Sequence, residues 1–116
     1  MPWTKILDDL KQRAAANIQP IPSDLDTFGL DKLREWVKQA SACVVGGWEF
    51  LLSRAEYEDK VIHWHLSALL YPKGRGSSEE DWRFVGQVAA YLGAPKEPMI
   101  VPEDPNRTIH WHWTEN

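Results

Sequence analysis

The chain has 116 residues and a mass of 13.4 kDa, enough for one domain and too little for two of ordinary size. Apolar residues make up 43% and charged residues 26%, which is the composition of a folded globular protein and excludes a wholly disordered chain. Acidic residues outnumber basic ones by 17 to 13, giving a net charge of −4. We therefore expect no broad electrostatic binding of duplex nucleic acid.

Two further features of the sequence bear on the cellular compartment in which we expect the protein. The single cysteine, Cys43, cannot form an internal disulfide, and the first ten residues carry charges where a signal peptide needs an apolar stretch. No apolar run approaches the roughly 18 residues of a membrane span. We expect a cytoplasmic protein that does not cross a membrane.

The first third of the chain predicts two helices. Over residues 3–17, apolar side chains recur at helical spacing: Trp3, Ile6, Leu7, Leu10 and Ala14. Pro20 and Pro22 end this pattern, so we interpret residues 1–19 as an amphipathic helix or arm and residues 20–116 as a single domain. A second helix is predicted over residues 29–42, from the stripe Leu30, Leu33, Trp36, Val37, Ala40, Cys43 and Val44.

From residue 48 the pattern becomes extended. Two apolar runs, residues 48–57 and 61–71, flank a predicted turn at residues 58–60. In the second run apolar and polar side chains alternate, so they point to opposite faces of a strand. The turn predicts a hairpin register in which Leu52 faces Leu66, Phe50 faces Ala68, and Ser53 lies beside His65.

The last third predicts one helix and two strands. Ser78 followed by acidic residues is typical of a helix start, and Gly93 of a helix end. The predicted buried stripe of this helix is Trp82, Val85, Val88, Ala89 and Leu92. A short strand at 99–101 and a final strand at 107–115 complete an α+β fold: two N-terminal helices followed by ββαββ, with a four-stranded, largely antiparallel sheet and helices on one face.

All four histidines lie in two copies of Ile-His-Trp-His, at residues 62–65 and 109–112. On a strand, each copy presents two imidazoles on one face and a Trp on the other. If the copies are antiparallel neighbours, the imidazoles form one cluster with the ligand type that zinc and other divalent transition metals use. The candidate metal ligands are His63, His65, His110 and His112.

The sequence leaves three interpretations of this cluster open: a metal site, an unliganded polar face, or a catalytic histidine pair. The segments His65-Leu66-Ser67 and His112-Trp113-Thr114 together resemble the paired signatures of two-histidine phosphoesterases. That resemblance implies that His65 and His112 act as general base and general acid, while Ser67 and Thr114 bind phosphate.

Two other resemblances concern the same strands. The triplet His63-Trp64-His65 resembles the metal-binding strand of single-strand nucleic-acid nickases and relaxases, which would make Tyr91 the nucleophile. Residues 48–116 resemble small uncharacterised proteins of bacteriophages and mobile elements, through a set of short motifs: His65 and Ser67, Gly74 and Arg75, Glu80 to Trp82, Ile100 to Pro102, and His110 with Trp111.

The phage resemblance implies an accessory protein. We expect it to bind a protein partner, or a second copy of itself, through the histidine face of the sheet, with or without a divalent metal such as zinc. The alternative is a phosphodiester hydrolase, either metal-assisted or of the two-histidine kind, that uses the paired His-Trp-His strands.

Overall fold

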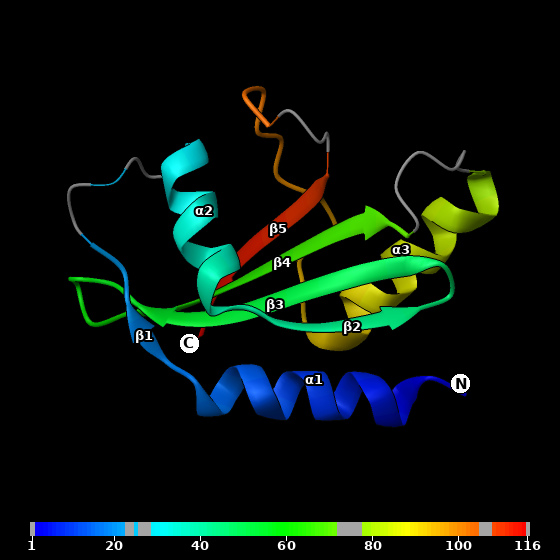
Figure 1. Cartoon of the computed structure of the whole chain (residues 1–116), viewed down its shortest axis with the longest axis horizontal. Helices are drawn as coiled ribbons and strands as arrows, with labels where there is room; N and C mark the ends of the chain where they lie inside the picture. Colours follow the sequence, from blue (N-terminus) through cyan, green and yellow to red (C-terminus); the bar gives the residue numbers. More distant parts are fainter. Residues whose placement is uncertain (1, 23–24, 26–28, 72–77, 105–107, 116) are drawn as a thin grey trace.

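The computed structural model describes residues 2–22, 25, 29–71, 78–104 and 108–115. This part of the chain forms an α+β fold of three helices and a five-stranded mixed sheet (Figure 1). The helices are α1 (Thr4–Ala16), α2 (Leu30–Gln39) and α3 (Glu79–Leu92). The strands are β1 (Gln19–Pro20), β2 (Ser41–Val45), β3 (Trp48–Glu56), β4 (Ile62–Leu70) and β5 (Ile109–Thr114).

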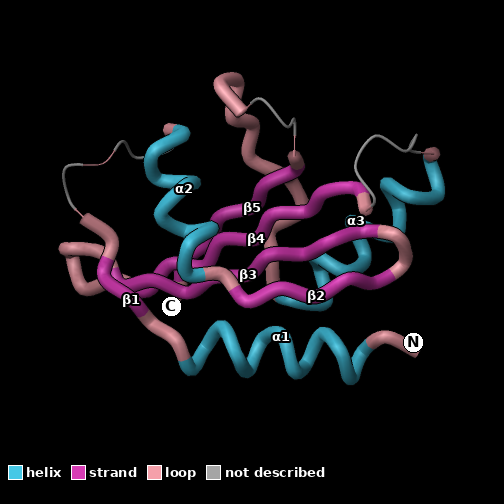
Figure 2. The backbone as a smooth tube through the Cα atoms, in the orientation of Figure 1, coloured by secondary structure: helices cyan, strands magenta, loops and turns pink. Residues whose placement is uncertain are grey.

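The long strands β3, β4 and β5 are antiparallel neighbours in chain order (Figure 2). On its other side β3 pairs with two short segments, antiparallel with β2 and parallel with β1. The predicted hairpin register is confirmed, with Leu52 opposite Leu66, Phe50 opposite Ala68 and Ser53 opposite His65.

The predicted helix over residues 29–42 is shorter in the structure, and its last part was wrongly assigned. After Gln39 the chain turns extended at Ala40, and Cys43 and Val44 belong to strand β2. Gly46 and Gly47 form a two-residue hairpin turn with φ of 60° and 79°, a conformation that glycine adopts without strain. At Gly46 a side chain would also lie within 2.7 Å of the Phe84 ring, so the position has no room for one.

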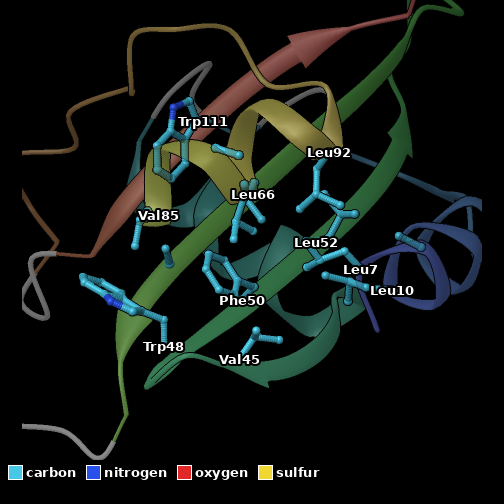
Figure 3. Packing of buried hydrophobic residues seen from close by; sticks show 14 of the residues in the cluster. Leu7, Leu10, Val45, Trp48, Phe50, Leu52, Leu66, Val85, Leu92 and Trp111 are labelled. Atoms are coloured by element: carbon cyan, nitrogen blue, oxygen red, sulfur yellow. The ribbon is translucent and has the colours of Figure 1, made fainter. Parts of the chain in front are cut away.

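Alternation along the strands separates the sheet into two faces. The first face is covered by α1 and α3 and holds the larger apolar core (Figure 3). Buried side chains of α1 and α3 pack there against those of the sheet: Leu7, Leu10, Val85, Val88 and Leu92 against Phe50, Leu52, Trp64, Leu66 and Trp111. The amphipathic helix near the N-terminus is thus part of the main core.

Helix α2 lies on the opposite face, which corrects the expectation of helices on one face only (Figure 1). Its buried side chains Leu33 and Trp36 pack with Ala55 of β3 and with Val101 from the segment that precedes β5. The histidine side of β4 and β5 is this second face. The hydrophobic stripe of α2 therefore covers the polar side of the sheet.

The start of α3 agrees with its sequence signals. Ser78 and Asp81 form a reciprocal capping box, and Gly93 ends the helix in the left-handed conformation with φ of 103°. Trp82, expected in the buried stripe, is instead 52% exposed, and its ring contacts that of Trp48 with 6.0 Å between centroids.

The predicted strand at 99–101 is reduced to a single bridge between Met99 and His110. Gly74 and Arg75, part of the phage resemblance, lie outside the described residues. None of the helices in the described residues is sufficiently long and apolar to span a bilayer.

Candidate functional site

The two His-Trp-His strands lie side by side, an arrangement that the sequence had left open. In the antiparallel register of β4 and β5, His65 faces His112 and Ser67 faces His110. All four histidines project from the same face of the sheet, because their positions differ by two along each strand. Helix α2 covers this face, so the imidazoles lie between two layers of the fold.

Two aromatic rings cover the histidines, Trp36 of α2 and Tyr57, the residue directly after β3. The Trp36 ring stacks on His65 with 4.2 Å between centroids and 16° between planes. The Tyr57 ring stacks on His63 at 3.5 Å and 15°. His65 is only 2% exposed, and burial, reinforced by the nearby His110 and His112, lowers its pKa well below the usual value. The imidazole of His65 is therefore neutral near pH 7.

A hydrogen bond joins the imidazole rings of His63 and His112. The Nδ1 atom of His63 lies 2.7 Å from Nε2 of His112, so one ring donates a hydrogen bond to the other. Burial lowers the pKa of His112 to about 4, and the positive potential of His63 and Lys32 acts in the same direction. Burial also lowers the pKa of His63. Both rings are consequently neutral at pH 7.

This hydrogen bond bears on the predicted metal site. Two imidazole nitrogens on one tetrahedral zinc ion, each about 2.05 Å from it, lie about 3.3 Å apart. In this structure Nδ1 of His63 and Nε2 of His112 lie 2.7 Å apart, which is a hydrogen-bond distance and shorter than the separation of two ligands of one zinc ion. Among the described residues, which include all four histidines, no group of three or more His, Cys, Asp or Glu side chains is arranged to hold a metal ion.

The two-histidine hypothesis assigned roles to four residues, which differ in burial and in hydrogen-bond partners: His65, His112, Ser67 and Thr114. His65 is enclosed beneath Trp36, and Ser67 bonds to His110 rather than to His65 or His112. Thr114 is exposed and pairs with His63 at the end of β5.

Tyr91, the nucleophile implied by the nickase resemblance, lies on α3 and donates a hydrogen bond to Asp8 of α1 at 2.7 Å. Helix α3 packs on the other face of the sheet, which separates Tyr91 from His63 and His65.

His110 is the centre of a buried polar relay. Its Nδ1 atom lies 3.0 Å from the Ser67 hydroxyl oxygen, and its Nε2 atom lies 2.7 Å from Oδ2 of Asp104. Thr108 adds a hydroxyl 2.6 Å from Nε2 of His110 and donates to the same Asp104 oxygen at 2.5 Å. The side chains of His110 and Asp104 are only 3% and 7% exposed.

Asp104 was not among the residues singled out from the sequence. It lies in a proline-rich loop, six residues before His110. The loop folds back because the backbone N–H of Thr108 donates to the Asp104 carboxylate, and Val101 packs beneath α2. The only sequence signal was an acidic side chain in a turn directly before a histidine strand, which is too common to identify a partner.

The relay opens into a cavity of about 610 Å³ between α2, the sheet and the loop before β5. Its walls are mainly apolar, formed by Leu30, Leu33, Val37, Leu51 and Leu69. Its polar side is formed by the relay residues Ser67, Asp104, Thr108 and His110. Three charged side chains complete the lining: Arg34, Lys38 and Glu49. An apolar space with a few convergent polar groups is the usual form of a small-molecule site.

No protein-family model, curated protein or solved structure matches this chain, so the chemistry of the cavity is inferred from its own residues.

Proposed function

We propose that this chain binds a small, largely apolar molecule in the cavity between α2 and the sheet. The observation that carries the proposal is the combination of an apolar wall with one polar side, in a space of about 610 Å³. That volume lies within the range of pockets that enclose small ligands. The apolar wall supplies affinity through burial, while Ser67, Thr108 and His110 offer hydrogen bonds that orient the ligand.

A small ligand fits this face better than a protein surface does. Helix α2 lies over the histidines, and His65, Ser67 and His110 are each 3% exposed or less. A protein partner would have to displace α2 and expose Leu33 and Trp36, which are buried beneath it. The protein partner, the phage setting and a metal at the histidines stay predictions from the sequence.

The proposal is tested with butyrophenone, an uncharged probe with an apolar body and one carbonyl acceptor. Wild-type protein is titrated by calorimetry, and the contact is located by nuclear Overhauser effects between the probe and the methyl groups of Leu33, Leu51 and Leu69. We expect saturable binding with effects to these methyl groups. Absence of saturable binding, or effects only to methyl groups outside the cavity, would contradict the proposal.

A matched pair of variants separates the cavity from general surface binding. Val37 is 45% exposed and lines the cavity, so Val37→Trp fills it without disturbing the buried core. Val44 is 48% exposed and does not belong to the lining, so Val44→Trp adds the same ring elsewhere. We expect Val37→Trp to weaken binding by about tenfold or more, which is about 1.4 kcal/mol, and Val44→Trp to leave it unchanged.

A further inference from the structure

We propose that Ser67, His110 and Asp104 form a nucleophilic triad that hydrolyses small uncharged esters whose apolar part occupies the cavity. This inference rests on the proposed function, because the ester is held by the same apolar wall. It adds a reaction to a binding site, and it assigns a different histidine and a different mechanism from the two-histidine resemblance.

The geometry matches the requirements of an activated serine. A nucleophilic hydroxyl needs a base within hydrogen-bond reach, and the base needs a third group that fixes its orientation. The Ser67 hydroxyl lies 3.0 Å from Nδ1 of His110, and Oδ2 of Asp104 lies 2.7 Å from Nε2 of the same ring. The Asp104 carboxylate accepts a hydrogen bond from Nε2–H of His110, which leaves the lone pair of Nδ1 directed at Ser67. Relative to the familiar serine protease arrangement, the two ring nitrogens exchange roles.

Burial supplies the protonation state that a general base needs. The pKa of His110 is lowered by burial, and the hydrogen bond and negative charge of Asp104 oppose this shift without reversing it. The ring is therefore neutral at pH 7 and able to accept a proton. Asp104 then stabilises the imidazolium that forms when His110 takes the proton of Ser67.

The reaction proceeds in two halves with water as the second substrate. In the first, the Ser67 oxygen attacks the ester carbonyl carbon while its proton passes to Nδ1 of His110. The bond from carbonyl carbon to alkoxy oxygen then breaks, the leaving alcohol takes that proton, and an acyl-Ser67 ester remains. In the second half water attacks the acyl carbon and the bond from that carbon to the Ser67 oxygen breaks, while a proton of the water passes through His110 to the Ser67 oxygen. The products are one alcohol and one carboxylic acid, and no electrons are transferred.

The lining of the cavity selects the class of ester. Its apolar side chains fit an alkyl or aryl group and would leave a charged group without water. The two cations in the lining, Arg34 and Lys38, are engaged by Asp31 and Glu35 at 3.5 and 3.0 Å. These two carboxylates balance the charges of Arg34 and Lys38, which disfavours an anionic substrate. An uncharged ester with a short apolar acyl group satisfies both conditions.

The test uses an alkyl fluorophosphonate, which modifies activated serine hydroxyls covalently, and 4-nitrophenyl butyrate as substrate. Trypsin would release residues 61–73 as one peptide in which Ser67 is the only serine, so mass spectrometry assigns the modification directly. We expect stoichiometric labelling of Ser67 in the wild-type chain and steady turnover of the ester. Ser67→Ala should abolish the labelling and lower kcat/KM by roughly 100-fold or more.

Ser53 provides the matched control. It lies on the same face of the sheet, is 2% exposed like Ser67, and does not belong to the cavity lining. We expect Ser53→Ala to keep wild-type labelling and turnover. Asp104→Asn should keep the serine in place but lower kcat far more than it changes KM, because it removes the orientation of His110. Circular dichroism of each variant verifies that it is folded.

The outcomes separate this inference from the proposed function. If Ser67 is not labelled, or if Ser67→Ala hydrolyses the ester as fast as wild type, the triad is refuted. Saturable binding of butyrophenone to the wild-type chain, with nuclear Overhauser effects to the methyl groups of the cavity, would then leave the binding function intact. Labelling of Ser67 in a chain that does not bind butyrophenone would support the triad and refute the proposed apolar ligand site.

Discussion

Lowering the pH from 7.5 to 5 is expected to destabilise the fold, because the buried histidines are held neutral. Burial, with the potential of His63 and Lys32, lowers the pKa of His112 to about 4, while the same side chain in the unfolded chain has a pKa of about 6.5. Between these values the unfolded chain binds a proton that the folded chain does not. Stability is therefore complete above about pH 6.5 and falls as the pH approaches 4.

The magnitude follows from the distance between the two pKa values. At pH 5, about 1.5 pH units below the unfolded value, His112 alone lowers the free energy of unfolding by about 2 kcal/mol. His65, whose pKa is held well below the usual value by burial, adds a loss of the same sign. Arg54 lowers the pKa of the Glu115 carboxyl below its ordinary 4.5, so this carboxylate loses its contribution only at lower pH.

The assay is urea-induced unfolding between pH 5 and 7.5 at constant ionic strength, followed by tryptophan fluorescence. His112→Gln should reduce the loss of stability between these pH values by about 2 kcal/mol. Thr114→Gln is the control, since it puts the same side chain at an exposed position on the same strand face without removing a titratable group. A pH dependence that is equal in wild type and His112→Gln would refute the reasoning.

Two further predictions concern the helix cap and the histidine pair. Ser78→Ala removes the side chain that accepts from the backbone N–H of Asp81, so we expect a loss of about 1 kcal/mol in urea unfolding at pH 7. An unchanged unfolding midpoint would contradict a stabilising cap. The hydrogen bond between His63 and His112 competes with binding of zinc to the same two nitrogens. We therefore expect that zinc added at pH 7 leaves the melting temperature of the protein unchanged. A rise in melting temperature that disappears in His112→Gln would instead restore the metal site predicted from the sequence.

The strand pattern was predicted well because it depends on local rules. Side chains alternate along a strand, so the apolar face of residues 62–70 and the spacing of the turn at 58–60 together determine the hairpin register. The repeat of Ile-His-Trp-His left the adjacency of β4 and β5 open, and the structure shows it. The cap at Ser78 and the left-handed end at Gly93 are likewise local chemistry.

The errors arose where one pattern fits two structures. The apolar spacing of residues 40–44 continues a helical stripe, yet Ala40 is extended and the double glycine makes a hairpin turn. Strand β2 forms because its backbone finds partners on β3, which is a contact between segments that helical periodicity does not report. The burial of Trp82 was also overestimated, because its helical spacing matches the buried stripe although the side chain is 52% exposed.

The sequence alone determined that the two histidines of each copy share one face of their strand, since alternation is a property of the strand itself. The pairing of β4 with β5, which brings the two pairs together, came from the structure. Only the tertiary structure decided their chemistry. Docking of α2 puts Trp36 over His65, and Asp104 of the loop before β5 contacts His110. These contacts depend on how separate segments bury apolar surface together, so no local pattern encodes them. They turn part of a polar sheet face into a cavity lined by a neutral base.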